Sequence, residues 1–269
     1  METLPTLDAH AHLAPSRTPT ELASSGAVLA MTVSLDEANL GVARREPWVA
    51  WGVGCHPRNL RAQQAFDPDR FGELVERAAF AGEIGLDKGS RVPLELQLRT
   101  FRRALRVLAG RPRMVSIHSY DATGLVLEEL KRTRVAVPVL HWWTGNVTET
   151  WEAVALGARF SIHSAVARQS KFRTSVPLDR LLIESDHGYS DPPAAIPCRV
   201  EWVEHLVAQQ RGLSVEQIRL LVWRNLGRTL GEAGALGLLP PLVAAAAREV
   251  CSDASAAPAS PFTRETGRG

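Results

Sequence analysis

The sequence predicts an α/β protein of the (β/α)8 TIM-barrel class, and three observations carry this prediction. The chain has 269 residues, and α/β barrels routinely reach about 250 residues as one domain. Eight short apolar runs alternate with amphipathic segments, a pattern typical of buried parallel strands joined by helices. A doubly wound open sheet is the competing architecture, but no glycine-rich dinucleotide turn follows the first run, which disfavours it.

The expected strands are short and rich in apolar residues, many of them β-branched, and they are spread over the first 183 residues. Length and composition favour buried strands over helix fragments. We expect them at Leu4–Ala9, Val28–Val33, Val49–Gly54, Phe80–Leu86, Met114–Ile117, Val135–Leu140, Arg159–Ile162 and Leu181–Ile183.

Helix signals lie between these strands. Residues 18–21 (Thr-Pro-Thr-Glu) place a cap, a first-turn proline and a capping-box acid in order. Asp67-Pro68 predicts the start of another helix, and leucines at helical spacing predict one over 94–108. We expect Thr148 to cap a helix that ends near Gly157.

The regular alternation fades after Gly231. Two adjacent prolines, an alanine run and a tail rich in Ser, Ala, Pro and Thr follow, a composition that favours a short helix and then disorder. We therefore expect the barrel to span residues 1–231, and residues 232–269 to form the short helix and a disordered tail.

Composition excludes several protein classes. A hydrophobic fraction of 45% is too high for a wholly disordered chain. Charges interrupt every apolar run before the ~18 residues of a membrane helix, and no secretory signal pattern is present at Met1–Asp8. Three widely spaced cysteines, Cys55, Cys198 and Cys251, fit reduced thiols. We expect a cytoplasmic protein without membrane contact, and a net charge of +2 leaves nucleic acid open as a partner.

The histidines cluster in the predicted fold. Six of the eight lie at or just past the C-terminal end of an expected strand, where a barrel carries its active site, and His187 follows the last strand closely. His205, by contrast, lies in a predicted helix. The six are His10, His12, His56, His118, His141 and His163.

Two acids complete a candidate metal site. Glu83 lies inside an apolar strand, where a carboxylate is costly to bury unless it is paired or binds metal, and Asp186 follows the eighth strand. Singly, each is more often a core or capping residue. Together with His10, His12, His118 and His141, they form a set that suits Zn²⁺, Mn²⁺ or a similar ion. Six ligands exceed the need of one tetrahedral ion, and a bridging carboxylate can hold two ions ~3.5–4 Å apart.

Six motifs occur in an order that resembles the TatD-type metal-dependent hydrolases, a nuclease branch related to the amidohydrolase superfamily of barrels. The resemblance runs from about Leu7 to Asn225. The motifs are Asp8-Ala9-His10-Ala11-His12-Leu13, Gly54-Cys55-His56-Pro57, Gly82-Glu83-Ile84-Gly85-Leu86-Asp87, Ile117-His118-Ser119, His141-Trp142-Trp143-Thr144-Gly145 and Glu184-Ser185-Asp186.

The resemblance implies an amidohydrolase-like barrel and a division of the ligands. His10, His12, Glu83 and Asp186 hold one divalent ion in this scheme. Glu83 bridges to a second ion, which His118 and His141 complete, and His56 lines the pocket. Members of the family are Mg²⁺- or Mn²⁺-dependent DNases, often with 3′→5′ exonuclease behaviour, so single-stranded DNA or a 3′ end is the implied partner.

Three departures from the family pattern affect the substrate. Tyr120 stands two residues after His118, where the family commonly has arginine, and an aromatic residue there can stack on a base. His187-Gly188-Tyr189 follows Asp186, where the family usually has a small residue and proline before tyrosine. The doublet Trp142-Trp143 replaces Cys-Phe and is similar to the TatD-like subunits of Qat anti-phage systems.

The expected reaction is hydrolysis of a phosphodiester by metal-activated water. Glu83 and Asp186 are the expected catalytic residues, with Asp186 as general base. For the substrate we expect contacts from Arg58 and Lys88 in loops on the active face, and from His56, Tyr120 and His187.

Two other functions fit the same residues. A binuclear amidohydrolase acting on an amide or lactone uses the same ions, although the bridging lysine of many such enzymes has no counterpart on the fourth strand, where Glu83 stands. A non-catalytic metal-binding subunit of a larger assembly is the other alternative. Tryptophans such as Trp202 can supply the protein interface that it needs, but retention of every expected ligand disfavours it.

Overall fold

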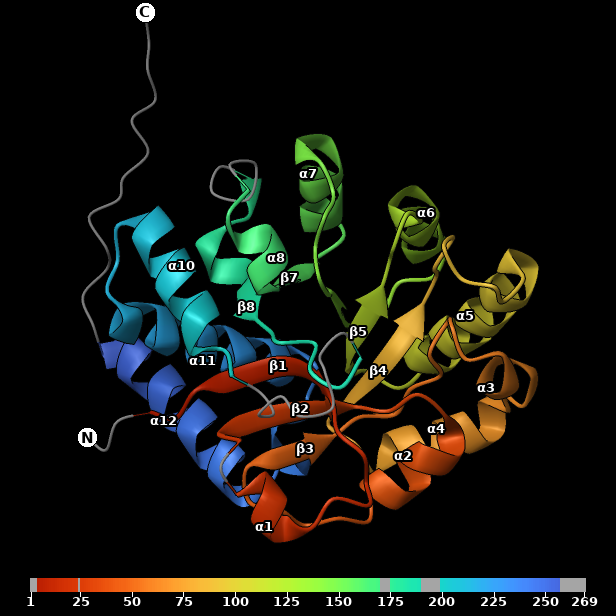
Figure 1. The fold of residues 1–269 in the computed structure, drawn as a ribbon, viewed down its shortest axis with the longest axis horizontal. Helices are drawn as coiled ribbons and strands as arrows, with labels where there is room; N and C mark the ends of the chain where they lie inside the picture. The colour runs from red at the N-terminus through yellow and green to blue at the C-terminus, as the bar shows by residue number, and fades with distance from the viewer. Residues whose placement is uncertain (1–3, 24, 170–174, 190–198, 257–269) are drawn as a thin grey trace, which may run out of the picture.

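Eight parallel strands close into a barrel in the computed structural model, which describes residues 4–23, 25–169, 175–189 and 199–256 (Figure 1). The fold class is the one expected from the sequence. The strands are β1 (Leu7–His12), β2 (Ala27–Met31), β3 (Val49–Trp51), β4 (Phe80–Gly85), β5 (Met114–His118), β6 (Val137–Leu140), β7 (Arg159–Ile162) and β8 (Leu181–Ile183).

Two junctions close the ring of strands. Strands β1 to β3 pair in order, and so do β4 to β8. A parallel bridge between Val53 and Ala81 joins the two groups just after β3. At the other junction, His10 accepts a backbone hydrogen bond from Asp186 (3.0 Å), and His12 donates one to His187 (2.7 Å). The carboxyl ends of all eight strands therefore meet at one end of the barrel.

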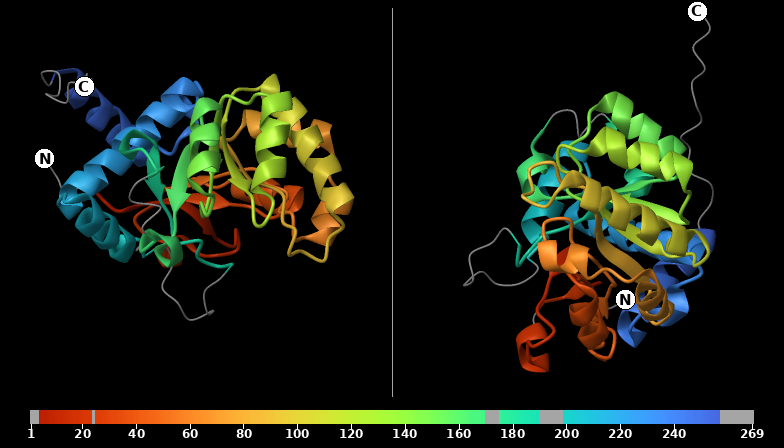
Figure 2. Two further views of the ribbon diagram at one scale, coloured as in Figure 1. Left: turned by 90° about the horizontal axis from the view of Figure 1, so that it is seen from above. Right: turned by 90° about the vertical axis from the view of Figure 1, so that its right-hand side faces the viewer.

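Helices surround the barrel, as the views from above and from the side show (Figure 2). Most of them follow a strand directly, and 3-10 turns at 178–180 and 236–238 complete the connections. The helices are α1 (Pro19–Leu22), α2 (Leu35–Gly41), α3 (Leu60–Gln64), α4 (Pro68–Glu76), α5 (Leu94–Ala109), α6 (Thr123–Arg132), α7 (Val147–Ala155), α8 (Ser164–Ala167), α10 (Glu201–Arg211), α11 (Val215–Glu232) and α12 (Pro241–Ala256).

The capping signals at the first helices are confirmed. Thr18 and Glu21 form the capping box of α1, and Asp67 accepts hydrogen bonds from the first turn of α4. The cap expected at Thr148 is wrong. Asn146 caps α7 instead and forms a capping box with Glu149, because a side-chain oxygen at that position reaches the third backbone amide of the helix.

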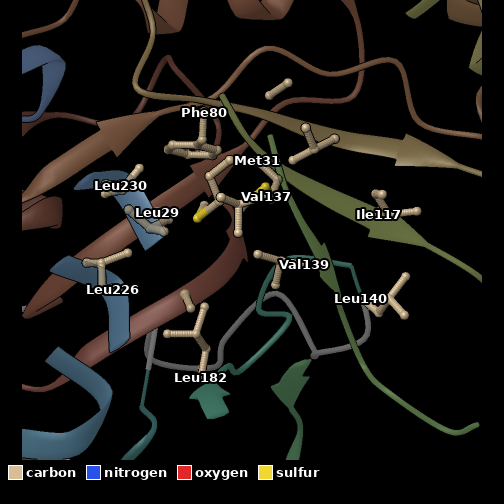
Figure 3. Close-up of a cluster of buried hydrophobic side chains, with 14 of the residues drawn as sticks. Leu29, Met31, Phe80, Ile117, Val137, Val139, Leu140, Leu182, Leu226 and Leu230 are labelled. Carbon is tan, nitrogen blue, oxygen red and sulfur yellow. The ribbon is translucent and has the colours of Figure 1, made fainter. Parts of the chain in front are cut away.

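The core fills the space inside the barrel and between strands and helices. Phe80 of β4 and Leu29 of β2 are fully buried, and leucines of α11 belong to the same cluster. Burial of each such side chain stabilises the fold by about 1.5–3 kcal/mol. Figure 3 shows part of this cluster, with Leu29, Met31, Phe80, Ile117, Val137, Val139, Leu140, Leu182, Leu226 and Leu230 labelled.

The first strand lies three residues later than expected. It begins at Leu7 rather than Leu4, because the preceding segment contacts α11. The carbonyl of Pro5 accepts a hydrogen bond from Trp223 Nε1 (2.9 Å), and the carbonyl of Leu4 accepts one from Arg219 (3.3 Å). His10 and His12 therefore lie within the strand rather than past its end.

The C-terminal part packs on the barrel through α12. Val243, Ala247 and Val250 of this helix are buried, and Cys251 lies against the backbone of Gly227 in α11. The expected domain boundary at residue 231 stays a prediction, and the expected disordered tail at 257–269 lies outside the described residues. No helix in the described ranges combines the length and apolar character that a membrane crossing requires.

Candidate metal centre

Local irregularities in two strands shape the site. Between Asp8 and Ala11, β1 has one residue more than β2 opposite it. Between Ala81 and Ile84, β4 has one residue more than β5. Such bulges re-aim side chains next to active sites. They lie at the positions of His10 and Glu83, which place their side chains at one point of the barrel.

Close approach of the backbones at this point requires glycine. A Cβ atom on Gly54 would lie 2.0 Å from the carbonyl oxygen of Thr32 and 2.4 Å from the amide nitrogen of Glu83. Gly54 precedes the Cys55-His56 pair, so the end of β3 can approach β4 and bring His56 beside Glu83.

Glu83 lies at the centre of the site and is fully buried. Its two carboxylate oxygens face different histidines. Oε2 lies 2.9 Å from His12 Nε2, 3.1 Å from His56 Nε2 and 3.5 Å from His10 Nε2. Oε1 lies 2.5 Å from His118 Nδ1 and 2.7 Å from His141 Nε2. One carboxylate thus touches imidazoles from four strands or strand ends.

Asp186 joins the same group from the loop after β8. Its Oδ1 atom lies 3.6 Å from Nε2 of His10 and 3.6 Å from Nε2 of His12. Its backbone is in the left-handed region (φ 48°), a costly conformation that persists at functional sites when its surroundings impose it. The six residues expected from the sequence therefore meet at one place. We call His10, His12, Glu83, His118, His141 and Asp186 the ligand cluster.

The donor atoms of this cluster suit a divalent cation. Nε2 of His10, Nε2 of His12 and Oε2 of Glu83 are buried and lie near one another, but their geometry does not allow hydrogen bonds between them, which is costly for polar atoms unless another group binds them. Three groups have ligand atoms within 4.8 Å of one another: His10, His12 and Glu83; His10, His141 and Asp186; and His56, Glu83 and His118. Imidazole nitrogens and carboxylate oxygens at such spacing fit Zn²⁺ or Mn²⁺.

The pKa shifts of His10 and Glu83 favour the same interpretation, whereas Glu83 raises the pKa of His118 and that of His141 against the opposing effect of burial. Burial, together with the nearby His141, lowers the pKa of His10 to about 3. Burial opposes ionisation of Glu83, but the surrounding imidazoles, above all His56, hold its pKa well below its usual range. Burial raises the pKa of Asp186 to about 7 against the opposing effect of His141. Neutral imidazole and ionised carboxylate are the forms that bind metal.

Second carboxylates hold two of the histidines, and the sequence analysis assigned them no role. Asp87 Oδ2 lies 3.0 Å from Nε2 of His118. Glu184 Oε1 lies 3.5 Å from Nδ1 of His141 and accepts the backbone N–H of Trp142 (2.6 Å). Both acids are buried. In the sequence, both acids directly follow apolar strand residues, and this position is the signal that could have identified them, as it identified Glu83.

Two hydrogen-bonded pairs support the ligands on β1. Nδ1 of His10 lies 2.8 Å from the hydroxyl of Ser116. Asp8 accepts the backbone N–H of Ser185 (3.0 Å) and its hydroxyl (2.5 Å). The second pair ties β1 to the segment that carries Asp186, so the two halves of the ligand cluster have a fixed separation.

A pocket of about 310 Å³ opens onto the ligand cluster. Its volume is at the lower end of the range for small-molecule sites, about 300–1,000 Å³. It is lined by Arg58, Asp87, His118, Ser119, Tyr120, His141, Trp142, Thr144, Asp186 and Tyr189.

Only some of the residues expected to contact the substrate lie at the pocket. Arg58 and Tyr120 line the pocket, and His56 lies beneath Tyr189, with ring centroids 4.5 Å apart. Lys88 is exposed in the neighbouring loop and is not part of the lining. His187 is buried, and its backbone N–H donates to the Ser185 hydroxyl, so it supports the loop rather than the pocket wall.

Comparison with known proteins identifies the family of the chain. The chain matches the family described as TatD related DNase over residues 7–231. It is 26% identical over 161 residues to the mouse (Mus musculus) protein named "Putative deoxyribonuclease TATDN3", which covers 56% of this chain and 55% of that protein. The chain thus spans about half the length of this relative.

Two Escherichia coli K12 proteins are also similar. "Uncharacterized metal-dependent hydrolase YcfH" is 26% identical over 193 residues, which cover 67% of this chain and 73% of that protein. The crystal structure of the TatD homologue YjjV superimposes with a TM-score of 0.73 at 22% identity, covering 84% of this chain and 97% of that one. That likeness shows the barrel fold. The family match spans most of the chain, and the protein therefore belongs to the TatD related DNase family.

Proposed function

We propose that the protein is a metal-dependent phosphodiesterase that removes nucleotides from 3′ ends of DNA and uses two divalent cations, Mg²⁺ or Mn²⁺, with Zn²⁺ compatible with the same donors. The position of Glu83 carries this proposal. Oε2 faces His10, His12 and His56, whereas Oε1 faces His118 and His141. A carboxylate whose two oxygens face different imidazoles is arranged as a bridge between two ions.

Each ion would have its own ligands in this arrangement. His10, His12, Asp186 and Glu83 would hold the first ion. His118, His141 and Glu83 would hold the second. When bound, the ions lower the pKa of a coordinated water and polarise the phosphoryl oxygen.

The remaining steps belong to side chains of this chain. Asp186 lines the pocket beside the ligand cluster and takes the proton of the attacking water as general base. Arg58, half-exposed at the pocket edge, attracts the phosphate of the substrate. Asp87 keeps Arg58 in place, with 3.7 Å between Oδ2 and Nε. The buried walls keep Glu83 and His141 away from bulk water.

Cleavage assays with the purified protein test the reaction. We expect Mg²⁺ or Mn²⁺ to support stepwise shortening of a 5′-labelled oligonucleotide, with chelation abolishing it. A carbonyl panel of amide and lactone substrates tests the amidohydrolase alternative. Hydrolysis of that panel without DNA cleavage in Mg²⁺, Mn²⁺ or Zn²⁺ would overturn the proposal. Glu83→Gln serves as the inactive control against contaminating nuclease.

The number of ions is tested separately by metal analysis of the protein after dialysis. We expect the wild type to bind two equivalents of Mn²⁺ and His118→Ala to retain one, because His118 lies on the Oε1 side of Glu83, away from the proposed first site. His205→Ala, on the exposed face of α10, should keep both. A single equivalent in the wild type would contradict the two-ion site.

A further inference from the structure

Aromatic side chains form much of the pocket wall above the ligand cluster. Tyr120, Trp142 and Tyr189 all line the pocket and come from the loops that follow β5, β6 and β8. We call these three residues the aromatic rim. Among the described residues, Arg58 is the only arginine or lysine that lines this pocket. The rim therefore offers a substrate flat apolar faces more than positive charge.

Trp142 is held rigidly in a costly conformation. Its φ of 41° is left-handed, which is a real outlier for a bulky residue. Its backbone N–H donates to the buried carboxylate of Glu184 (2.6 Å). Its ring stacks on His163, with centroids 3.9 Å apart and planes inclined by 24°. The fold thus fixes one face of the indole and leaves the half-buried ring on the pocket wall. An outlier imposed in this way supports a role in function.

The side chain of Tyr120, in the loop after β5, is largely exposed to solvent. The side chain is 61% exposed, so core packing does not explain it. Its ring rests against Gly89, where a Cβ atom would lie 3.0 Å from the ring edge. Its carbonyl accepts the backbone N–H of Lys88 (3.1 Å). A large flat ring supported from one side and open to the pocket is ready to stack.

Tyr189 differs from the other two. It stacks on His56, with centroids 4.5 Å apart, and the guanidinium of Arg58 lies 5.8 Å from its ring centroid. Its contacts therefore lie within the protein, and it forms a fixed wall over the histidines. Tyr120 and Trp142 are the members of the rim that remain for a ligand.

We propose that Tyr120 and Trp142 are the specificity-determining residues of the pocket and stack on the base of the terminal nucleotide. This inference rests on the proposed function. Base–aromatic stacking needs an accessible base face, which duplex DNA supplies only after unpairing and unstacking. A pocket of about 310 Å³ holds a group the size of one nucleotide, with its phosphate at the ligand cluster and its base at the rim.

Comparing substrates with and without a base at the 3′ end tests this inference. The wild type and the variants Tyr120→Ala, Tyr120→Phe and Trp142→Ala are compared on a single-stranded oligonucleotide and on the same oligonucleotide with an abasic 3′ residue. Stacking against one base predicts a fall of about 5- to 150-fold in kcat/KM for each alanine variant on the normal end. The abasic end should be cleaved equally by all forms. Tyr120→Phe should retain the wild-type rate, because it keeps the ring.

Trp151→Ala is the matched control, since this tryptophan on α7 is 54% exposed and lies outside the pocket lining. It should leave both rates unchanged. A blunt duplex should be a poorer substrate than the single strand, and this preference should shrink in Tyr120→Ala. Equal losses on the normal and abasic ends, or no loss on either, would overturn the inference. Tyr120→Ala changes a surface side chain, so it decides the question even where Trp142→Ala fails to fold.

Binding separates this inference from the proposed reaction. Both oligonucleotides are titrated into the protein in chelator, and affinity is followed by fluorescence anisotropy. We expect the normal end to bind about 5- to 150-fold more tightly than the abasic end, with the difference reduced in Tyr120→Ala. If no form cleaves DNA, the proposed function fails, and this titration still decides whether the rim recognises a base. Equal affinity for the two ends would refute base recognition.

Discussion

Nε2 of His118 lies 3.0 Å from Oδ2 of Asp87. The other nitrogen of the same ring, Nδ1, faces Glu83 at 2.5 Å. A carboxylate on the far nitrogen fixes both the orientation and the tautomer of a histidine that binds metal. We therefore expect Asp87 to position His118 in the proposed second ion site.

Replacing Asp87 tests that role. Asp87→Asn should lower activity and Mn²⁺ affinity by about 10–100-fold, because the amide no longer fixes His118 with a charged acceptor. Calorimetric titration with Mn²⁺ measures the affinity. Asp69→Asn, an exposed position in the first turn of α4, is the control and should leave both quantities unchanged. Wild-type affinity in Asp87→Asn would show that His118 is held by other contacts.

The most damaging single change should be at Glu83. Glu83→Ala removes the carboxylate that faces five imidazoles, so we expect at least a ~100-fold loss of activity. His205→Ala should stay within about 0.5 kcal/mol of wild-type stability and keep full activity. Rates on DNA and thermal melts of both variants check this. Full activity in Glu83→Ala would remove Glu83 from the mechanism.

Salt dependence tests how the chain attracts DNA. Arg58 lines the pocket and Lys88 is exposed beside it, so Arg58→Ala and Lys88→Ala should weaken binding and reduce the salt slope by about 1 each. Arg106→Ala carries the same charge loss in the last turn of α5, at the far end of the barrel, and should change neither. Titration of a labelled oligonucleotide across a salt series measures all three. Equal effects would mean attraction by net charge alone.

Stability should depend on the contact between the N-terminal segment and α11. Trp223 is fully buried, and its Nε1–H donates to the carbonyl of Pro5. Trp223→Phe loses this hydrogen bond and leaves a small cavity, so we expect a loss of about 1–3 kcal/mol in the free energy of unfolding. Trp202→Phe, at a position 58% exposed, should change it by less than about 0.5 kcal/mol. Urea denaturation of both variants makes the comparison.

Much of the fold could be predicted because parallel strands leave a simple pattern. Seven of the eight strands overlap their expected ranges closely, since buried β-branched runs bounded by caps and glycines have few other structures. The first strand was misplaced because its start depends on α11, more than 200 residues away in sequence. A long-range contact of this kind has no local signal.

The candidate site was likewise only partly predictable from the sequence. Histidines at strand ends and Glu83 within a strand predicted that the ligand cluster would meet, because all strand ends share one face. The roles of its members as ligands remain predictions. Asp87 and Glu184 were not assigned, since which acid reaches which imidazole depends on the loop conformation. Lys88 lies outside the pocket lining because its side chain extends to solvent from the loop.

The closure of the barrel also dictates when the site can form. Asp8 and Ser185 are hydrogen-bonded across 177 positions of sequence, and Asp186 adds its carboxylate to histidines of the first strand. Contacts between such distant segments form late, since the entropy of closing a long loop opposes them. During synthesis, His10 and His12 are therefore present long before Asp186, the acid that lies beside them in the folded protein. Under the proposed function, the residues needed for hydrolysis come together only after the eighth strand has docked, so a chain that lacks this strand has no complete site.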